Sequence, residues 1–260
     1  MLSSKLFSFG WFVLLSLCFA AAESRWPANV GPKLVHRLHN FAIAIVVAGV
    51  MTLVTGAISC LPGVHVPSVA GFFLGELKPT QVSEIALFTF AYAIIWDFFQ
   101  YWAHRLQHSV PILWETHALH HDDERLNATT ALRFPVLTRF VNFFLVTVPT
   151  VAICGGDLLN IYGSVFLLVS WNFFNHANIR LDLGWLTPII SGPQWHRLHH
   201  GRDDRYHGKN FAAFFPVWDI VFGTYLAPQK QEYPLTGLPG RQTLPSSLPA
   251  LLRPIFSMRS

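Results

Sequence analysis

The sequence predicts an all-α membrane protein with about five transmembrane helices. Hydrophobic residues make up 52% of the 260 residues and charged residues only 12%, whereas a soluble domain carries about 25% charged residues. Mean hydropathy is +0.39, and five apolar segments recur along the chain. A hydrocarbon core of about 30 Å needs roughly 20 residues at about 1.5 Å per residue, and most of the segments approach or exceed this length.

The first apolar segment, Leu6 to Ala22, has two possible interpretations. Lys5 precedes it and Ala20-Ala21-Ala22 ends it, a pattern typical of a signal peptide with a small-residue cleavage site. A retained transmembrane helix fits the same residues. Because the two interpretations place the rest of the chain on opposite sides of the membrane, the distribution of basic residues decides between them.

Four more apolar segments follow along the chain. The second is Leu38 to Leu61, and the third, Val82 to Phe99, runs directly into a histidine-rich stretch. The fourth and fifth are Pro135 to Cys154 and Leu158 to Phe174. Gly155-Gly156-Asp157 joins these two, and such a short turn-forming sequence favours a helical hairpin.

Basic residues indicate the orientation of these segments. If the first segment is retained with the amino terminus outside, loops 23–39, 100–139 and 176–260 face the cytoplasm and contain 16 of the 18 lysines and arginines. Only Lys5 and Lys78 then face outward. The positive-inside rule favours this arrangement over cleavage of a signal peptide. We therefore expect a multi-pass protein of the bacterial cytoplasmic membrane or the endoplasmic reticulum, with a cytoplasmic carboxyl terminus.

One integral-membrane domain is expected over residues 1–260, because the length suits a single domain. It would comprise N-terminal spans in 1–80, a histidine-rich core in 81–226 and a proline-rich tail in 227–260, in which regular secondary structure should not persist. The formal charge of +4 without a basic cluster predicts no nucleic-acid partner. Three widely separated cysteines predict no disulfide framework, and nothing in the sequence indicates an oligomeric state.

Nine histidines have a spacing that matches the turn of a helix. His104 and His108 are four residues apart, and His117, His120 and His121 follow at i, i+3 and i+4. Residues with these spacings lie on one face of an α-helix. The i, i+3, i+4 spacing recurs in the last cluster, and one histidine lies between. The full set is His104, His108, His117, His120, His121, His176, His196, His199 and His200.

This histidine set predicts a metal site. Neutral imidazole is a common ligand of iron, zinc and copper. Nine imidazoles exceed the roughly six ligands of an octahedral ion, so the set indicates two metals, each with a position open to oxygen or water. The expected topology puts all of them on the cytoplasmic side, which predicts a cytoplasmic histidine-ligated di-metal site. His36, His39 and His65 have no such spacing and are assigned no role as ligands.

These motifs resemble those of the fatty acid hydroxylase/sterol desaturase superfamily of membrane-bound di-iron oxygenases. Asp97, which lies seven residues before His104, also matches the family pattern. So do two short sequence stretches, Trp218-Asp219 and Phe222-Gly223-Thr224. The resemblance is close over about Asp97 to Thr224. It implies an oxidoreductase with two iron ions (Fe2+) and O2 as co-substrate. Its substrate would be a membrane lipid (sterol, fatty acyl, sphingoid or a related apolar molecule), which it hydroxylates or desaturates.

The electrons for such a reaction would come from an external donor. The sequence contains no Cys-x-x-Cys-His haem attachment motif, no Gly-x-Gly-x-x-Gly motif and no spare cysteine set for an iron–sulfur cluster. We therefore expect a separate electron-transfer protein that is cytochrome b5-, ferredoxin- or reductase-like.

One departure from the family pattern concerns the number of ligands. Some relatives carry a second histidine four positions after the one that matches His176, and here that position is Arg180. Asn178 or His207 could take its place. We expect His207 to lie outside the ligand set, because loop histidines near a charged run are usually solvated.

Carboxylates near the histidines are candidates to orient the imidazole rings by accepting the second ring proton. Asp97 is the first candidate, because it lies two helical turns from His104 near the end of an apolar span, where a carboxylate is costly. The alternative is an ion pair with a nearby arginine. Asp219 and Asn178 are further candidates for such supporting contacts.

Three alternatives remain open from the residues alone. A membrane zinc hydrolase would need only three or four ligands, but the sequence lacks His-Glu-x-x-His. A haem-binding electron carrier would place single histidines in the middle of facing spans. A non-enzymatic metal transporter would place its ligands near the midplane of the membrane. Metal analysis with a visible spectrum separates these possibilities.

Overall fold

The computed structural model describes residues 2–59, 81–154 and 158–240, and this part of the chain is mostly helical. Within it, the β-pairing consists of two isolated bridges, Pro27 with Ile179 and Gly201 with Thr236. The all-α prediction is therefore confirmed for the described residues. The Gly155-Gly156-Asp157 turn, Lys78 and most of the proline-rich tail lie outside them.

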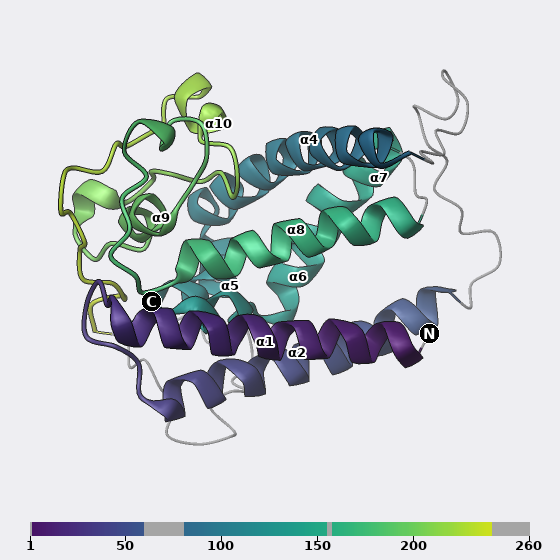
Figure 1. Cartoon of the computed structure of the whole chain (residues 1–260), viewed down its shortest axis with the longest axis horizontal. Helices are drawn as coiled ribbons and strands as arrows, with labels where there is room; N and C mark the ends of the chain where they lie inside the picture. The colour runs from purple at the N-terminus through teal and green to yellow at the C-terminus, as the bar shows by residue number, and fades with distance from the viewer. Residues whose placement is uncertain (1, 60–80, 155–157, 241–260) are drawn as a thin grey trace.

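Long helices form one part of the molecule, and their axes lie roughly parallel to one another in Figure 1. They are α1 (Leu2–Arg25), α2 (Leu34–Ser59), α4 (Val82–Ser109) and α8 (Leu158–His176). The α4 helix packs against α8, and α8 packs against α1. Each coincides with one of the predicted apolar segments, although α4 continues ten residues beyond the predicted end at Phe99 and carries the first two histidines.

Three helical stretches in the described residues are long and apolar enough to cross a membrane. They are Leu34–Val54, Val82–Ser109 and Val136–Cys154. The helices at the other two predicted spans, α1 and α8, are 24 and 19 residues long. The helical part of the five-span prediction therefore agrees with the structure, while three of the five segments are identified as candidate spans.

The stretch Val136–Cys154 contains a wider turn in its middle. It consists of α6 (Val136–Asn142), the π-helical turn η2 (Phe143–Thr147) and α7 (Val148–Cys154). The N–H of Val148 donates to the carbonyl of Phe143, five residues earlier. Pro149 follows at once; proline has no N–H, and its ring clashes with the carbonyl four residues before it. The wider turn accommodates this proline without ending the helix.

Short elements gather at the carboxyl-terminal ends of α4 and α8 and form a cap on the long helices (Figure 1). They are α5 (Pro111–His121), η1 (Ala128–Leu132), η3 (Gly184–Leu186), α9 (Pro193–His199), η4 (Asp204–Tyr206) and α10 (Val217–Val221). Pro111 and Pro193 begin α5 and α9, where a missing N–H costs nothing. Both helices carry predicted histidines, as expected from the spacing.

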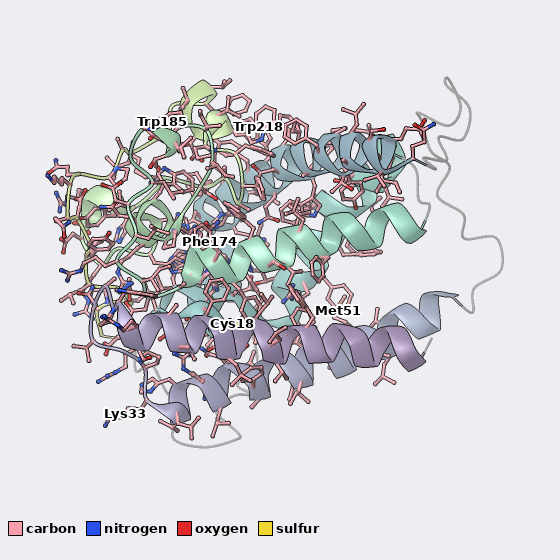
Figure 2. The ribbon with its side chains drawn as sticks, in the orientation of Figure 1. Cys18, Lys33, Met51, Phe174, Trp185 and Trp218 are labelled. Atoms are coloured by element: carbon pink, nitrogen blue, oxygen red, sulfur yellow. The ribbon has the colours of Figure 1, made fainter. Side chains whose placement is uncertain are left out.

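The end of α1 is tied to this cap. The buried carboxylate of Glu23 accepts hydrogen bonds from the backbone N–H of Ala128 (2.7 Å) and of Asn178 (2.9 Å), and it forms an ion pair with Arg37. Lys33, in the linker from α1 to α2, lies at the same end of the molecule (Figure 2). The first two helices therefore help to position the loops that precede and follow the histidines.

Candidate metal centre

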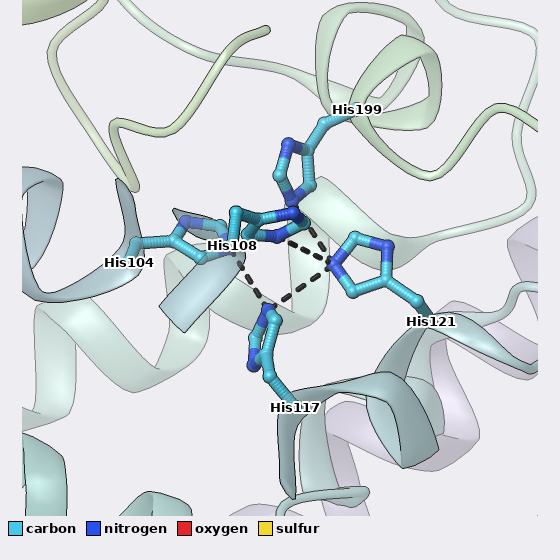
Figure 3. Close-up of side chains that lie close together, drawn as sticks. All are labelled: His104, His108, His117, His121 and His199. Atoms are coloured by element: carbon cyan, nitrogen blue, oxygen red, sulfur yellow. Dashed lines mark hydrogen bonds between the residues drawn. The ribbon is translucent and has the colours of Figure 1, made fainter. Parts of the chain in front are cut away.

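All nine predicted histidines come together in two groups at the base of the cap. The ligand atoms within each group lie within 4.8 Å of one another. The first group is His104, His108, His117, His121 and His199, shown in Figure 3. The second group is His120, His176, His196 and His200. All are buried except His108, which is half-buried.

Helical spacing divides each cluster between the two groups. On α5, the i and i+4 residues His117 and His121 join the first group, whereas His120 at i+3 joins the second. At α9 the division is reversed, because the i and i+4 pair His196 and His200 joins the second group and the intervening i+3 residue joins the first. Each helix therefore contributes to both groups, and this sets the two groups side by side.

The Nε2 atoms of the rings converge at short distances. In the first group, Nε2 of His121 lies 3.1 Å from Nε2 of His117, 3.1 Å from that of His108 and 3.2 Å from that of His199. The Nε2 atoms of His104 and His117 are 3.0 Å apart. In the second group, Nε2 of His176 lies 3.0 Å from that of His120 and 3.1 Å from that of His196.

Backbone carbonyls fix the tautomer of three of these rings. Nδ1 of His104 donates to the carbonyl of Phe211, that of His199 to Lys209 and that of His176 to Asn172, each at 2.7 Å. A neutral imidazole carries one ring proton, so these bonds leave Nε2 of each ring as a lone pair. Two of these lone pairs lie in the first group, where a single proton on His121 cannot bond three neighbours. The second group holds one of them, and buried ring nitrogens of His120, His196 and His200 have no hydrogen-bond partner there. The donor set therefore fits a cation in each group.

Burial keeps the rings outside the long helices neutral. Desolvation is the largest cause that lowers the pKa of His117, His120, His121, His196, His199 and His200 well below the ordinary value, and neighbouring imidazoles lower it further. Neutral imidazole is the form that binds a metal. The site therefore offers its lone pairs at neutral pH without first having to lose protons.

The spacing of the nitrogens suits a shared ion. Two nitrogens about 2.1 Å from one ion lie roughly 3–4 Å apart, and the shortest Nε2 to Nε2 distances in the two groups are 3.0–3.2 Å. Five donors in the first group also exceed the usual four ligands of structural zinc.

Asp97 lies close to the site but has a different partner from the one expected. Its carboxylate accepts hydrogen bonds from the backbone N–H groups of Ala213 (2.8 Å), Phe214 (2.9 Å) and Phe215 (2.6 Å). Neither the expected imidazole nor the alternative arginine is among these partners. The physical reason is that the loop after α9 passes beside α4 and brings three unpaired amides to a buried carboxylate.

Asp219 acts on the same loop from the other side. It accepts hydrogen bonds from the backbone N–H of Phe211 and of Ala212, both at 2.8 Å, and from the hydroxyl of Thr224 at 2.6 Å. The two carboxylates thus hold five consecutive amides, residues 211–215. Because the carbonyl of Phe211 bonds to His104, both aspartates support the ring of His104 through the backbone.

Three residues that bear on the predicted number of ligands, Asn178, Arg180 and His207, lie outside both groups. The amide of Asn178 is used in hydrogen bonds with the backbone of Asn29 and with Arg197. The guanidinium of Arg180 lies over the ring of Tyr233 and donates to a backbone carbonyl. His207 is half-exposed and lies 3.6 Å from Asp204. The second group therefore has four donors where the first has five.

Arg133 was not identified from the sequence. Its buried guanidinium donates to the carbonyl of Leu119 (2.7 Å) and pairs with Asp122, so it holds the last turn of α5, which carries His120 and His121. The carbonyls of Asn172, Lys209 and Phe211 were also not anticipated. Every residue has a carbonyl, so these contacts have no sequence signature.

A cavity of about 560 Å³ opens beside the two groups. Its walls include His108, His121, His199 and His200, with His207 and Arg105 also in the lining. Members of both groups therefore face a space that is large enough for part of a ligand, because ligand sites span about 300–1,000 Å³.

Comparisons with known proteins agree with this geometry. Residues 89–224, more than half of the chain, match the family model described as fatty acid hydroxylase. Human alkylglycerol monooxygenase is 36% identical over 141 residues, which cover 54% of this chain and 31% of that protein. Ornithine lipid hydroxylase OlsE of Rhizobium tropici is 29% identical over 151 residues, 57% of this chain and 44% of that protein.

A third relative is methylsterol monooxygenase erg25A of Aspergillus fumigatus, 25% identical over 161 residues, which cover 59% of this chain and 50% of that protein. The chain therefore spans about a third to a half of the length of these relatives. No solved structure gives a significant match. The matched region contains every histidine of the two groups.

Proposed function

This chain belongs to the fatty acid hydroxylase family, and we propose that it is a membrane-bound di-iron monooxygenase that hydroxylates a lipid. The observation that carries the proposal is the convergence of nine histidines into two adjacent groups. The relatives are named as monooxygenases or hydroxylases of alkylglycerols, ornithine lipids and methylsterols. These names favour hydroxylation over desaturation and a lipid as the substrate.

We assign one iron ion to each group of histidines. When bound, the two ions supply the electrons and the Lewis acidity for O2 activation. The overall reaction takes a C–H bond, O2, two electrons and two protons to an alcohol and water. No carrier motif occurs in the sequence, so the source of these two electrons, which reach O2 through the ions, is assigned to a separate electron-transfer protein.

The residues of the chain hold and orient this site. The carbonyls of Phe211, Lys209 and Asn172 keep three rings in the tautomer that presents Nε2. Asp97 and Asp219 hold the loop that carries Phe211. Burial of the rings excludes water from the histidine core, which favours oxidation of a bound lipid over loss of reducing equivalents.

We also propose the five-span topology for the whole chain, with the site on the cytoplasmic face of a bacterial cytoplasmic or endoplasmic reticulum membrane. The distribution of lysine and arginine supports it. Retention of α1 is supported by the packing of Phe12, Leu15 and Phe19 on the cluster around Phe173. In this arrangement residues 1–260 form one domain: spans in 1–80, a catalytic core in 81–226 and a tail in 227–260.

Lipid profiling tests the proposal. Cells that express the protein and cells that express His121→Ala are grown under isotopically labelled O2, and their lipids are compared by mass spectrometry. We expect at least one lipid to gain a single labelled oxygen only with the unchanged protein. A folded, membrane-inserted protein that produces no labelled lipid with a competent electron donor present would contradict the proposal.

A further inference from the structure

An apolar groove runs along α4 on the side that faces the π-helical turn. Its volume is about 680 Å³, which lies within the range of ligand sites. The side chains of α4 in its lining include Phe98, Phe99 and Trp102, and those of the opposite wall are Phe144, Leu145, Val148 and Pro149. Phe144 and Leu145, both on the π-helical turn, are 59% and 40% exposed, so the groove opens to the surroundings of the helices.

The groove borders the histidine-lined cavity. Arg105 and Ser109, one turn apart on α4, line both spaces. His108 lies between them in the sequence and lines the second space only. The two spaces therefore meet at Arg105 and Ser109, and these side chains lie between the groove and the histidines.

The charge at this junction forms no ion pair among the described residues, although it interacts at longer range with the carboxylate of Asp219. Arg105 donates through Nη1 to the hydroxyl of Tyr101 (2.9 Å) and to the carbonyl of Phe222 (3.4 Å), and its guanidinium lies 5.6 Å from the centroid of Trp102. No carboxylate lies within ion-pair distance of it in this part of the chain. Arginine has five N–H donors in a fork that matches phosphate and carboxylate groups, so Arg105 can bind an anion.

From this geometry, and resting on the proposed lipid substrate, we propose that the groove and the cavity form one lipid site. The apolar chain of the lipid lies in the groove, and Arg105 binds an anionic headgroup (a phosphate or a carboxylate) at the junction. The shared lining of the two spaces and the N–H groups of Arg105 beyond Nη1, which form no hydrogen bond among the described residues, support this occupant. The carbons next to the headgroup then lie nearest the histidines, and the far end of the chain points away from them.

Photolabelling of the full-length protein in phosphatidylcholine nanodiscs tests the proposal. The probe is a monoacylglycerol phosphate with a diazirine near the end of its chain, and its matched control is the same monoacylglycerol without phosphate. We expect both to label residues of the groove, among them Phe144, Leu145 and Val148. The phosphate probe should do so at a concentration about tenfold lower, because hydrogen bonds to charged groups are the stronger kind.

Two substitutions separate the headgroup contact from the groove. Arg105→Gln should remove the roughly tenfold preference for the phosphate probe and leave labelling by the neutral probe and the metal content unchanged. Arg125→Gln, on an arginine that bonds to the carbonyl of Gly31, is the matched control and should keep the preference. Leu145→Trp should reduce labelling by both probes, whereas Ile153→Trp, on the same helical stretch but outside the groove lining, should not.

The results that would overturn the proposal are labelling outside the groove, equal labelling by the two probes, or a preference that persists in Arg105→Gln. If Arg105→Gln does not fold, unchanged labelling in Leu145→Trp would overturn it as well. Labelling does not require turnover. Arg105-dependent labelling in a protein that never oxidises lipid would therefore contradict the proposed function alone, and active protein without it would contradict this inference alone.

Discussion

The two histidine groups share helices, because α5 and the end of α9 each contribute histidines to both. The membership of nine histidines in a metal site follows from i, i+3 and i+4 spacing, because helical geometry depends only on neighbouring residues. The division into groups of five and four depends on how α4, α5, α8 and α9 pack, which no local pattern encodes. The same reason explains why Asp97 was expected to contact an imidazole, whereas it bonds to amides more than one hundred residues away.

The central position of His121 leads to the first prediction. Its Nε2 lies within 3.2 Å of three other Nε2 atoms, so His121→Ala should abolish turnover and lower bound iron. His207→Ala should keep both ions and lose at most about 10–100-fold in activity, as for residues outside the ligand set. Elemental analysis of the folded variants distinguishes the two. Loss of half of the metal in His207→Ala would show that His207 is a ligand.

Asp219 leads to a prediction about support of the site. Asp219→Asn replaces an acceptor of two backbone amides and a hydroxyl, and the lost or unsatisfied bonds should cost about 1–3 kcal/mol. Iron affinity should fall by about 10–100-fold, because the loop that holds His104 loosens. Thermal unfolding and iron titration in detergent measure both effects. The control is Asp203→Asn on an exposed aspartate, and equal behaviour of the two variants would refute the assigned role.

Among the secondary-structure elements, the positions of the long helices were predicted from the sequence, but the irregular turn within one of them was not. Apolar length identified each long helix, and Pro111 and Pro193 mark the beginnings of α5 and α9. The π-helical turn at Phe143–Thr147 was not predicted, although Pro149 is visible in the sequence, because a proline in a span can be accommodated by a kink, a break or a wider turn. Which of these occurs depends on the packing of α4 against this stretch.

The link between α1 and the cap gives a prediction at this scale. Glu23→Gln removes the charge that pairs with Arg37 and weakens the bonds to the amides of Ala128 and Asn178. Breaking a buried ion pair costs about 3–5 kcal/mol, so the unfolding midpoint should fall markedly. Glu124→Gln breaks a pair with Arg202 that is largely exposed and should cost at most about 1 kcal/mol. Equal losses in the two variants would contradict this assignment for α1.

The topology of the whole molecule combines a known part with a proposed part. Composition and apolar length predicted a helical membrane protein, and three candidate spans occur in the described residues. The side of the membrane on which the histidines lie depends on the distribution of charge rather than on any contact within the fold. We propose it from the sequence through the positive-inside rule, and the packing of α1 on the cluster around Phe173 supports it by favouring retention of the first span.

Reporter fusions test this orientation. A reporter joined after Gly63 should lie outside and one joined after Ser260 should lie in the cytoplasm, because 16 of the 18 lysines and arginines are then cytoplasmic. A fusion after Asn29, in the linker between α1 and α2, should also be cytoplasmic. A reporter at Ser260 found outside would contradict the topology.

Metal content is the decisive measurement for the proposed di-iron centre. The full-length protein is purified in detergent without added metal, and its iron, zinc and copper are measured together with its visible spectrum. We expect about two iron ions per chain, since each histidine group fits one cation, without the strong Soret absorption of haem. A single zinc ion per chain, or a haem spectrum, in protein that is folded and active would contradict it.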